Sequence, residues 1–415
     1  MLPQHVRKTF CGGLFILTLC GILTACDGSE TPSVSLDFDS ASAQYVKVDS
    51  GKRIRFSLAA NAGADERLWF YFRVQSSTPI SPQFVIENAS EAHQHNWDVV
   101  RPVFSSDGKS WVKTEPDGAE LETSLLSRLI AKLQGRRPGF RFQSPITASD
   151  FWVAYSYPYS NQELSRYLAS IETDPRVNFS SLGQSAQGRP IRKIDIAAPP
   201  GNRATDLQDI WIICREHPGE TPAAFVLEGL VDAILDKSAD SDLLSSFRFH
   251  IVPMLNVDGV AEGNYYRNTE GIDIAQDWKT FQSVETRALH EAMHEGLESL
   301  NVALVVNLHS ANAPRSHFFL KTPPNRLLVE LAEIQDRLFE SGSAAHAQLQ
   351  ATETVELWDF PEITGNYLSE HYGVYCLYLE SNYSIGADGS VVTQDSLRDL
   401  GAALSQIIAA ILVET

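Results

Sequence analysis

Residues 210–222 read Ile-Trp-Ile-Ile-Cys-Arg-Glu-His-Pro-Gly-Glu-Thr-Pro, an apolar run followed at once by polar and turn-forming residues. The apolar part predicts a buried strand, and the closing Thr-Pro pair predicts the start of a helix with Thr221 as its cap. His217 and Glu220 lie in the turn between them, so both side chains can face one metal ion. On its own this spacing is a weak signal, because an isolated pair of this kind is commonly a solvated surface pair.

The same strand-and-helix alternation continues on both sides of this stretch. Residues 161–415 therefore predict one α/β domain, a mixed sheet flanked by helices, with its chemistry at the carboxyl ends of the strands. The predicted strands are Ile210–Cys214, Phe247–Pro253, Val302–Leu308 and Val374–Glu380, and the predicted helices are Pro222–Leu235, Val284–Leu297, Pro324–Phe339 and Gln394–Leu412.

Residues 43–160 have a different pattern, in which short apolar or aromatic runs are broken by turn residues such as Asp107-Gly108. This pattern predicts a small antiparallel β-domain in front of the α/β domain, with residues 121–133 as a helical insertion. The runs expected to form strands are Arg53–Leu58, Leu68–Val74, Gln83–Ile86, Trp111–Lys113 and Phe151–Tyr155.

Two further strand ends carry polar residues that complete a catalytic set. His309 follows the strand Val302–Leu308, and with His217 and Glu220 it gives two imidazoles and one carboxylate, which leaves one position of a tetrahedral zinc ion open to water. Glu380 ends another apolar run, where burial penalises a charged group that has no task. The sequence therefore predicts a zinc site on the first three residues and a functional task for the carboxylate of Glu380.

The segments around these residues resemble the zinc metallocarboxypeptidases, in their cytosolic-carboxypeptidase-like branch. The resemblance covers about residues 160–415, and the aromatic run at 68–74 also resembles the amino-terminal domain of that branch. It implies a carboxypeptidase-like fold, Zn²⁺ as cofactor, a peptide or amide substrate, Glu380 as general base and Arg267 as the residue that stabilises the developing oxyanion. The matching motifs are His217-Pro218-Gly219-Glu220-Thr221-Pro222, Pro253-Met254-Leu255-Asn256, Asp258-Gly259-Val260, Gly263-Asn264-Tyr265, Asp273, Trp278, Leu308-His309 and Leu379-Glu380.

The sequence departs from the family where a carboxypeptidase grips the free carboxylate of its substrate. The family has an Asn-Arg pair there, and this chain has Ala275 and Gln276, so a charge-assisted clamp is lost. Asp277 would repel a carboxylate if it pointed inward. Gln276 remains a candidate substrate-binding residue. Arg315, which follows the third ligand in the sequence, is a second candidate and could supply the positive charge for the substrate's carboxylate.

The first residues form a leader. Residues 1–25 have a short basic region and an apolar run too short to span a bilayer comfortably, so they predict a secretory signal. The leader ends in Leu-Thr-Ala-Cys, which resembles the lipobox of bacterial lipoproteins and implies that Cys26 carries a lipid; an ordinary signal peptide is the alternative. Residues 26–42 are then expected to form a tether. Asp27 resembles the signal that retains such lipoproteins in the inner membrane, which implies a protein that faces the periplasm.

The net charge and the cysteine content limit the kinds of partner and cross-link that we expect. The formal charge of −19 disfavours nucleic acid and an anionic membrane face as primary partners. Only Cys214 and Cys376 lie in the folded part, which is no disulfide framework; two buried thiols are expected, with a single bridge between them as the alternative.

Two functions from different classes remain. The first is a zinc-dependent hydrolase of peptide or amide bonds whose specificity for a free carboxylate is in doubt because of Ala275 and Gln276. The second is a non-catalytic, lipid-anchored module that keeps the fold and binds a peptide or an envelope component; the retained Glu380 argues against it, since binding alone does not need a base.

Overall fold

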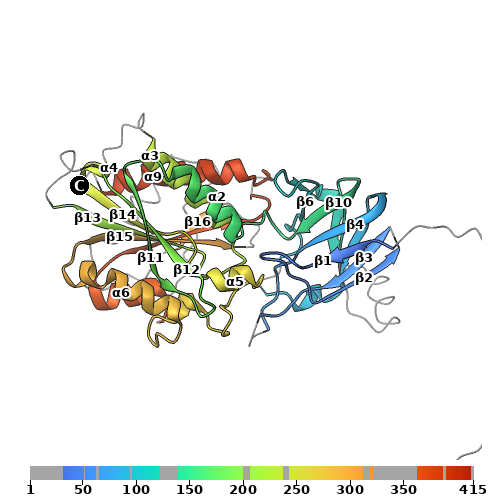
Figure 1. Cartoon of the computed structure of the whole chain (residues 1–415), viewed down its shortest axis with the longest axis horizontal. Coiled ribbons are helices and arrows are strands. Elements are labelled where there is room, and N and C mark those ends of the chain that lie inside the picture. The colour runs from blue at the N-terminus through green and yellow to red at the C-terminus, as the bar shows by residue number, and fades with distance from the viewer. Residues whose placement is uncertain are drawn as a thin grey trace, which may run out of the picture.

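The computed structural model describes residues 31–50, 52–61, 65–93, 96–121, 139–199, 206–236, 243–311, 317–320, 362–386 and 389–412. The chain forms two parts that lie end to end (Figure 1). Strands β1 to β10 make a β-rich part, and the elements from α2 to α9 make an α/β part. This is the predicted fold class, an α/β domain with a mixed sheet behind a smaller β-domain.

The β-rich part consists of two five-stranded sheets with an aromatic core. The rings of Phe72 and Phe84 bring the two sheets together, with centroids 6.1 Å apart, and Phe84 stacks on Phe142 at 5.2 Å. Alternation along the strands directs these rings inward. The first sheet has the order β1 (Ser33–Ser35), β4 (Tyr71–Ile80), β10 (Ala148–Ala154), β6 (Val103–Ser105) and β7 (Val112–Lys113), and the second has the order β2 (Tyr45–Ser50), β3 (Arg53–Ser57), β5 (Gln83–Ile86), β9 (Phe140–Gln143) and β8 (Ala119–Leu121).

Two details differ from the prediction for this region. The predicted tether includes β1, which pairs with β4 in antiparallel register; a polar three-residue edge strand has no periodic signal that separates it from a linker. The sheets are also not purely antiparallel, because β3 and β5 pair in parallel. The predicted helical insertion lies almost wholly outside the described residues.

A seven-stranded mixed sheet forms the centre of the α/β part. Its inner strands β14, β13, β15 and β17 run parallel, so their carboxyl ends meet at one edge. The residues of β13 are buried from Asp209 to Cys214, as expected for a strand covered on both faces. The order is β11 (Val177–Gln184), β12 (Pro190–Ile196), β14 (Phe247–Val252), β13 (Gln208–Cys214), β15 (Val302–Ala311), β17 (Cys376–Asn382) and β16 (Phe318–Leu320).

Helices cover both faces of this sheet, with α3 and α9 on one side and α6 on the other (Figure 1). Helices α3 and α9 approach so closely that a Cβ atom on Gly229 would lie 2.0 Å from the carbonyl oxygen of Arg398. The helices are α2 (Asn161–Ile171), α3 (Pro222–Leu235), α4 (Leu243–Ser246), α5 (Val257–Ala261), α6 (Val284–Glu298), α8 (Thr364–Tyr372) and α9 (Gln394–Leu412), with short 3₁₀ turns at Ala89–Glu91, Pro116–Gly118 and Ile274–Gln276.

The start of α3 differs from the prediction in one respect. Thr221 makes no capping hydrogen bond with its side chain, because its own backbone is already helical, with φ −65° and ψ −31°. The hydroxyl of Ser310, on β15, accepts the hydrogen bond of the Ala223 N–H instead, at 3.1 Å. The predicted helix at 324–339 lies outside the described residues.

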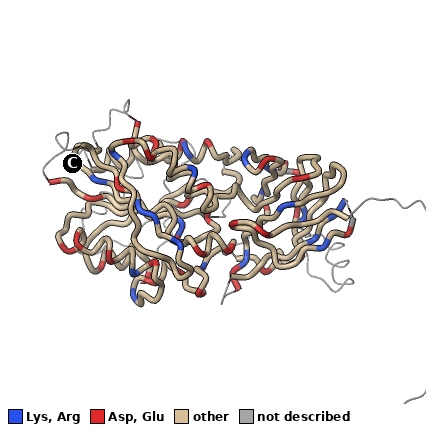
Figure 2. Tube along the Cα trace, in the orientation of Figure 1, with Lys and Arg blue, Asp and Glu red and all other residues tan. Residues whose placement is uncertain are grey.

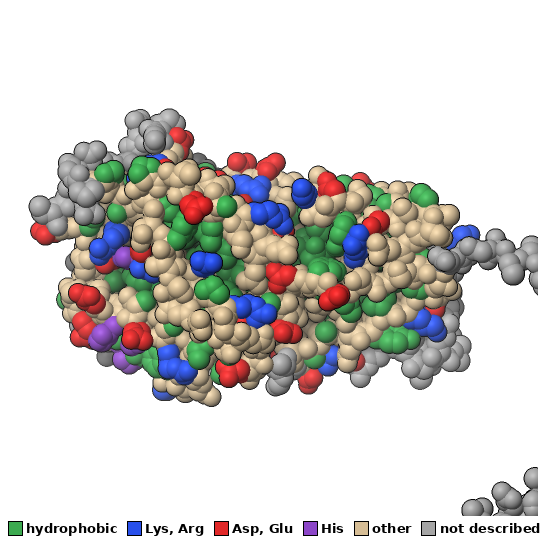
Figure 3. Space-filling view, viewed as in Figure 1, with side chains coloured by type: hydrophobic (Ala, Val, Ile, Leu, Met, Phe, Trp, Pro, Cys, Tyr) green, Lys and Arg blue, Asp and Glu red, His purple; other side chains and the backbone are tan. Residues whose placement is uncertain are grey.

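The surface shows how the charge of the chain is distributed. Acidic residues occur along both parts of the chain (Figure 2), and on the face shown in Figure 3 they are interspersed with Lys and Arg. Among the helices that the structure describes, none has the length and apolar character needed to span a bilayer.

Candidate active site

A strained turn at the end of β13 positions the first two predicted ligands. Arg215 has a φ of 61°, a left-handed conformation that side chains other than glycine adopt rarely. Its buried guanidinium holds the turn by donating to the carbonyl oxygens of Tyr159, at 3.0 Å, and Pro218. The chain therefore reverses directly after the strand, and His217 and Glu220 both lie at the carboxyl edge of the sheet.

The three predicted ligands His217, Glu220 and His309 meet at this edge. The Nδ1 atom of His217 lies 2.8 Å from Glu220 Oε1, and Nδ1 of His309 lies 3.0 Å from Glu220 Oε2. The two Nδ1 atoms are 3.2 Å apart. Ligand atoms around a tetrahedral zinc ion are separated by about 3.3 Å, so these three buried side chains fit zinc in both chemistry and spacing.

Each imidazole is held on its far side by a second carboxylate. The Nε2 atom of His217 lies 3.3 Å from Asp273 Oδ1, and Nε2 of His309 lies 3.1 Å from Glu216 Oε2. This arrangement leaves Nδ1 of both rings facing the shared centre. Burial alone would lower the pKa of His217, but Glu220 and Asp273 raise it to about 9.

Glu380 lies on β17, beside the third ligand. In the parallel pairing of β15 with β17, Glu380 is the direct partner of His309. Burial opposes protonation of His309, but Glu220, Glu216 and Glu380 together raise the pKa of His309 well above its usual value. A carboxylate at this position can exchange a proton with a group bound at the metal ligands.

Arg267, the residue expected to stabilise the oxyanion, forms an ion pair in the structure. Its guanidinium binds Glu66 of the β-rich part, with Nη2 2.7 Å and Nε 3.0 Å from Oε1. The preceding residue, Tyr266, stacks on His217 instead, with ring centroids 3.8 Å apart. The loop therefore directs the Tyr266 ring onto His217 and the Arg267 guanidinium toward Glu66.

The residues that replace the family's Asn-Arg pair also have other tasks. The amide of Gln276 donates to Asp273 Oδ2 at 2.6 Å, and Ala275 is buried. Asp277 does not point into the site: its carboxylate accepts hydrogen bonds from the backbone N–H groups of Gln282, at 2.9 Å, and Ser283, at 2.8 Å. These contacts fix the loop that leads into α6.

The remaining residues singled out in the sequence do not lie among the proposed metal ligands. Arg315, Cys26 and Asp27 are outside the described residues. Cys214 and Cys376 are buried and both carry free thiols.

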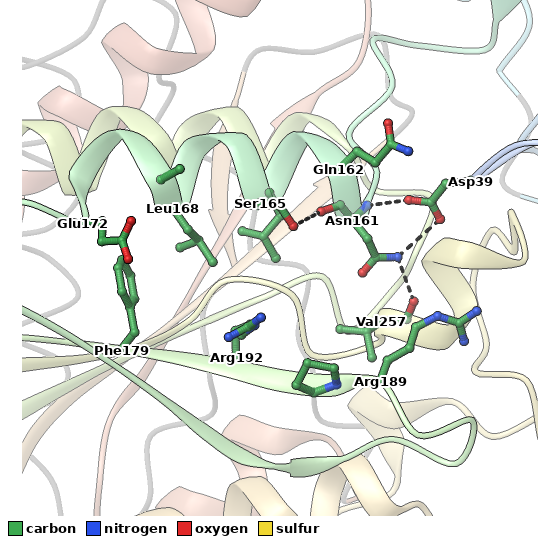
Figure 4. Close-up of a pocket in the computed structure, with 13 residues that line it drawn as sticks. Asp39, Asn161, Gln162, Ser165, Leu168, Glu172, Phe179, Arg189, Arg192 and Val257 are labelled. Atoms are coloured by element: carbon green, nitrogen blue, oxygen red, sulfur yellow. Dashed lines mark hydrogen bonds between the residues drawn. The ribbon is translucent and has the colours of Figure 1, made fainter.

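A cavity of about 660 Å³ lies away from the metal ligands, between α2 and strands β11 and β12 (Figure 4). At one end of it the side chain of Asp39 accepts a hydrogen bond from the N–H of Asn161 at 2.9 Å, and the Asn161 amide donates to the carbonyl of Val257 at 3.3 Å. These contacts tie the segment between β1 and β2 to α2 and α5.

Comparison with known proteins identifies two matching families. Residues 164–353 match the zinc carboxypeptidase family, and residues 34–128 match the cytosolic carboxypeptidase N-terminal domain. An uncharacterized protein of Zymomonas mobilis is 26% identical over 312 residues, which are 74% of each chain. Cytosolic carboxypeptidase 2 of Xenopus tropicalis and cytosolic carboxypeptidase 6 of Homo sapiens are each 29% identical over 51% of this chain. The matched regions make up only 23% and 42% of those two proteins.

Solved structures show the same fold. The metallo-carboxypeptidase of Burkholderia cenocepacia has a TM-score of 0.79 at 23% identity, over 92% of this chain and 98% of that chain. The metallo-carboxypeptidase of Pseudomonas aeruginosa, solved with (2-guanidinoethylmercapto)succinic acid, has a TM-score of 0.78 at 22% identity, over 92% and 99%. This chain therefore carries a zinc carboxypeptidase domain preceded by a cytosolic carboxypeptidase N-terminal domain.

Proposed function

We propose that this protein hydrolyses a peptide or amide bond in substrates whose end is not a free carboxylate. One combination of features carries the proposal: His217, Glu220 and His309 converge beside Glu380, while the residues at the expected carboxylate-binding positions bring no free positive charge. The chain thus keeps the family's metal ligands and general base, but Ala275 and Gln276 replace the Asn-Arg pair that would bind a substrate's terminal carboxylate.

The catalytic residues divide the work as follows. When bound by His217, Glu220 and His309, zinc supplies a Lewis acid and a reactive water near neutral pH. Glu380 accepts the proton of the attacking water and passes it to the leaving amine, because it lies beside His309 on the neighbouring strand. Tyr266 covers one face of the His217 ring and keeps that ring oriented.

The substrate class follows from charge. An anionic substrate end needs a guanidinium or ammonium partner to be taken out of water. Gln276 is neutral and turned to Asp273, and Arg267 is occupied by Glu66, so neither offers one. A peptide with an amidated, esterified or otherwise neutral end binds without that cost.

The deciding experiment compares turnover of matched peptides with free and amidated ends by the native protein and by Glu380→Gln. We expect cleavage by the native protein and a loss of at least about 1,000-fold in kcat for Glu380→Gln, with zinc content unchanged. Glu370→Gln, an exposed glutamate on α8, is the matched control and should keep full activity. Zinc-loaded native protein that turns over no peptide or amide would favour the non-catalytic binding module instead.

We also propose that the mature protein is attached to the membrane by a lipid on Cys26 and faces the periplasm. The proposal rests on the basic and apolar regions of the leader and on its Leu-Thr-Ala-Cys ending. A soluble peptide or a cell-wall peptide would then reach the site from the periplasm.

A further inference from the structure

Glu216 is a fully buried carboxylate that directly precedes the first metal ligand. Its side chain has no exposed surface, and its two oxygens accept three hydrogen bonds. Asn307 Nδ2 donates to Oε2 at 2.7 Å, Thr364 Oγ1 donates to Oε1 at 2.9 Å, and His309 Nε2 lies 3.1 Å from Oε2. The group that can hold a metal ion consists of His217, Glu220 and His309 and does not include Glu216.

The contact with Glu216 determines which nitrogen of His309 faces the ligand group. Nδ1 lies 3.0 Å from Glu220 Oε2 and 3.2 Å from His217 Nδ1, and only Nε2 reaches Glu216. A carboxylate accepts a proton and never donates one when it is ionised. Glu216 therefore keeps the N–H on Nε2, and the lone pair of Nδ1 stays available to a metal ion.

The charge of Glu216 has no other basic partner in the contacts that the structure describes. Asn307 and Thr364 are neutral donors, and the neighbouring Arg215 gives its guanidinium to two carbonyl oxygens. A buried carboxylate without a cation is costly, so this charge requires compensation nearby. His309 would transmit that compensation through its imidazole if its Nδ1 held a dication.

We propose that Glu216 is a positioning residue of the metal centre, which fixes the tautomer and orientation of His309 and strengthens the hold on the metal through its negative charge. The inference rests on the ligand assignment in the proposed function. It adds that the affinity for zinc depends on Glu216, which does not touch the metal. Glu216 then does for His309 what Asp273 does for His217.

The test is the affinity of the metal-free full-length protein for zinc, measured by competition with a chromophoric chelator. Glu216→Gln removes the charge, while its amide oxygen can still accept from Asn307 and His309. We expect zinc affinity to fall about 10- to 100-fold. Glu228→Gln is the control, because Glu228 is also a buried carboxylate but is bound by Tyr159 and Arg398, and its affinity should equal that of the native protein.

A spectroscopic readout separates positioning from a general loss of structure. In the cobalt-loaded protein, the shifted N–H protons of the two ligand histidines give separate NMR signals. Glu216→Gln should shift the signal of the His309 Nε2–H and leave that of His217, which Asp273 holds. If Glu216→Gln does not fold, Glu216→Asp keeps the charge but is one methylene too short to reach His309, and it should also bind zinc at least about 10-fold more weakly.

The outcomes distinguish this inference from the proposed function. If His309→Ala loses zinc while Glu216→Gln and Glu216→Asp bind it as tightly as the native protein, the role of Glu216 is wrong and the ligand assignment stands. If His309→Ala keeps full zinc content, the ligand assignment itself is wrong.

Discussion

The two proposed ligand histidines, His217 and His309, are held by carboxylates that favour their protonated form when no metal is bound. Zinc binds only the neutral imidazole, so the ion must displace a proton at any pH below the histidine pKa. Because Glu220 and Asp273 raise the pKa of His217 to about 9, this competition extends across the neutral range. The site therefore combines a strong ligand set with a marked sensitivity to pH.

We accordingly predict that zinc affinity falls as the pH is lowered from 9 to 7, by about tenfold per pH unit for each proton displaced. Chelator competition at pH 9, 8 and 7 measures this slope. Asp273→Asn removes one of the carboxylates that raise the pKa of His217, so that pKa should be lower. The zinc affinity of this variant should therefore stop rising at a lower pH than that of the native protein. An affinity that is constant between pH 9 and pH 7 in the native protein contradicts the prediction.

Specificity for the substrate end is also set by single residues. We predict that Gln276→Arg, alone or with Ala275→Asn, raises kcat/KM for peptides with a free carboxylate by about 30- to 1,000-fold, which corresponds to a gain of about 2 to 4 kcal/mol from a charge-assisted pair. Amidated peptides should change little, since they offer no charge to the new guanidinium. The single variant avoids enlarging the buried Ala275.

The same comparison can overturn the substrate proposal. A native protein that already prefers free-carboxylate peptides, and that is unaffected by Gln276→Arg, would mean that another cation holds the substrate's end. Arg315 is then the first residue to replace.

At the scale of elements, the contact of α3 with α9 positions the helix that follows the first two ligands. Gly229 allows this approach, because any Cβ there would meet the backbone of α9. We predict that Gly229→Ala lowers the free energy of unfolding by about 1 to 3 kcal/mol, although alanine is the better helix former. Urea denaturation measures the change.

A second helical glycine provides the control for this prediction. A Cβ on Gly296, in α6, would lie 3.1 Å from the Cγ2 methyl group of Val302, a side chain that can shift by a few tenths of an ångström. Gly296→Ala should therefore have little effect on stability or raise it slightly. If both variants unfold at the same urea concentration as the native protein, the close contact between α3 and α9 is not a constraint on stability.

At the scale of the whole molecule, the β-rich part contacts the loop at residues 265–267, which lies against the proposed metal ligand His217. Glu66 binds Arg267, and the side chain of Asn61 accepts the hydrogen bond of the Tyr265 N–H at 2.9 Å. These contacts hold residues 265–267, where Tyr266 stacks on His217. The β-rich part therefore influences the site without supplying any of its proposed metal ligands.

The attachment of the whole molecule to a membrane gives the last prediction. Cys26→Ser should move the protein from the membrane fraction to the soluble fraction and block maturation of the leader, because the thiol is the group that would carry the lipid. Fractionation and the mass of the mature amino terminus measure both effects. Cys20→Ser, inside the leader, should leave attachment unchanged; membrane-bound Cys26→Ser protein of normal size would exclude the lipoprotein proposal.

The sequence by itself determined the family, the fold class and the chemistry of the proposed metal site, because these depend on local patterns. The bounds of α3 and α9 match the periodic segments predicted for them, and His217 and Glu220 follow β13, an apolar strand whose end the sequence marks. His309 lies inside β15, which extends to Ala311, beyond the predicted end at Leu308. Strand β1 falls within the predicted tether because it is short and polar, so its sequence does not distinguish it from a linker.

Only the tertiary structure decided what surrounds those ligands. The contact of Glu216 with His309 joins residues 93 apart, and the ion pair of Arg267 with Glu66 joins residues 201 apart. Neither leaves a periodic signal, because each depends on strand register and on how the two parts of the chain meet. The resemblance implied a role for Arg267 at the site, but its pairing with Glu66 and the stacking of Tyr266 on His217 are visible only in the tertiary structure.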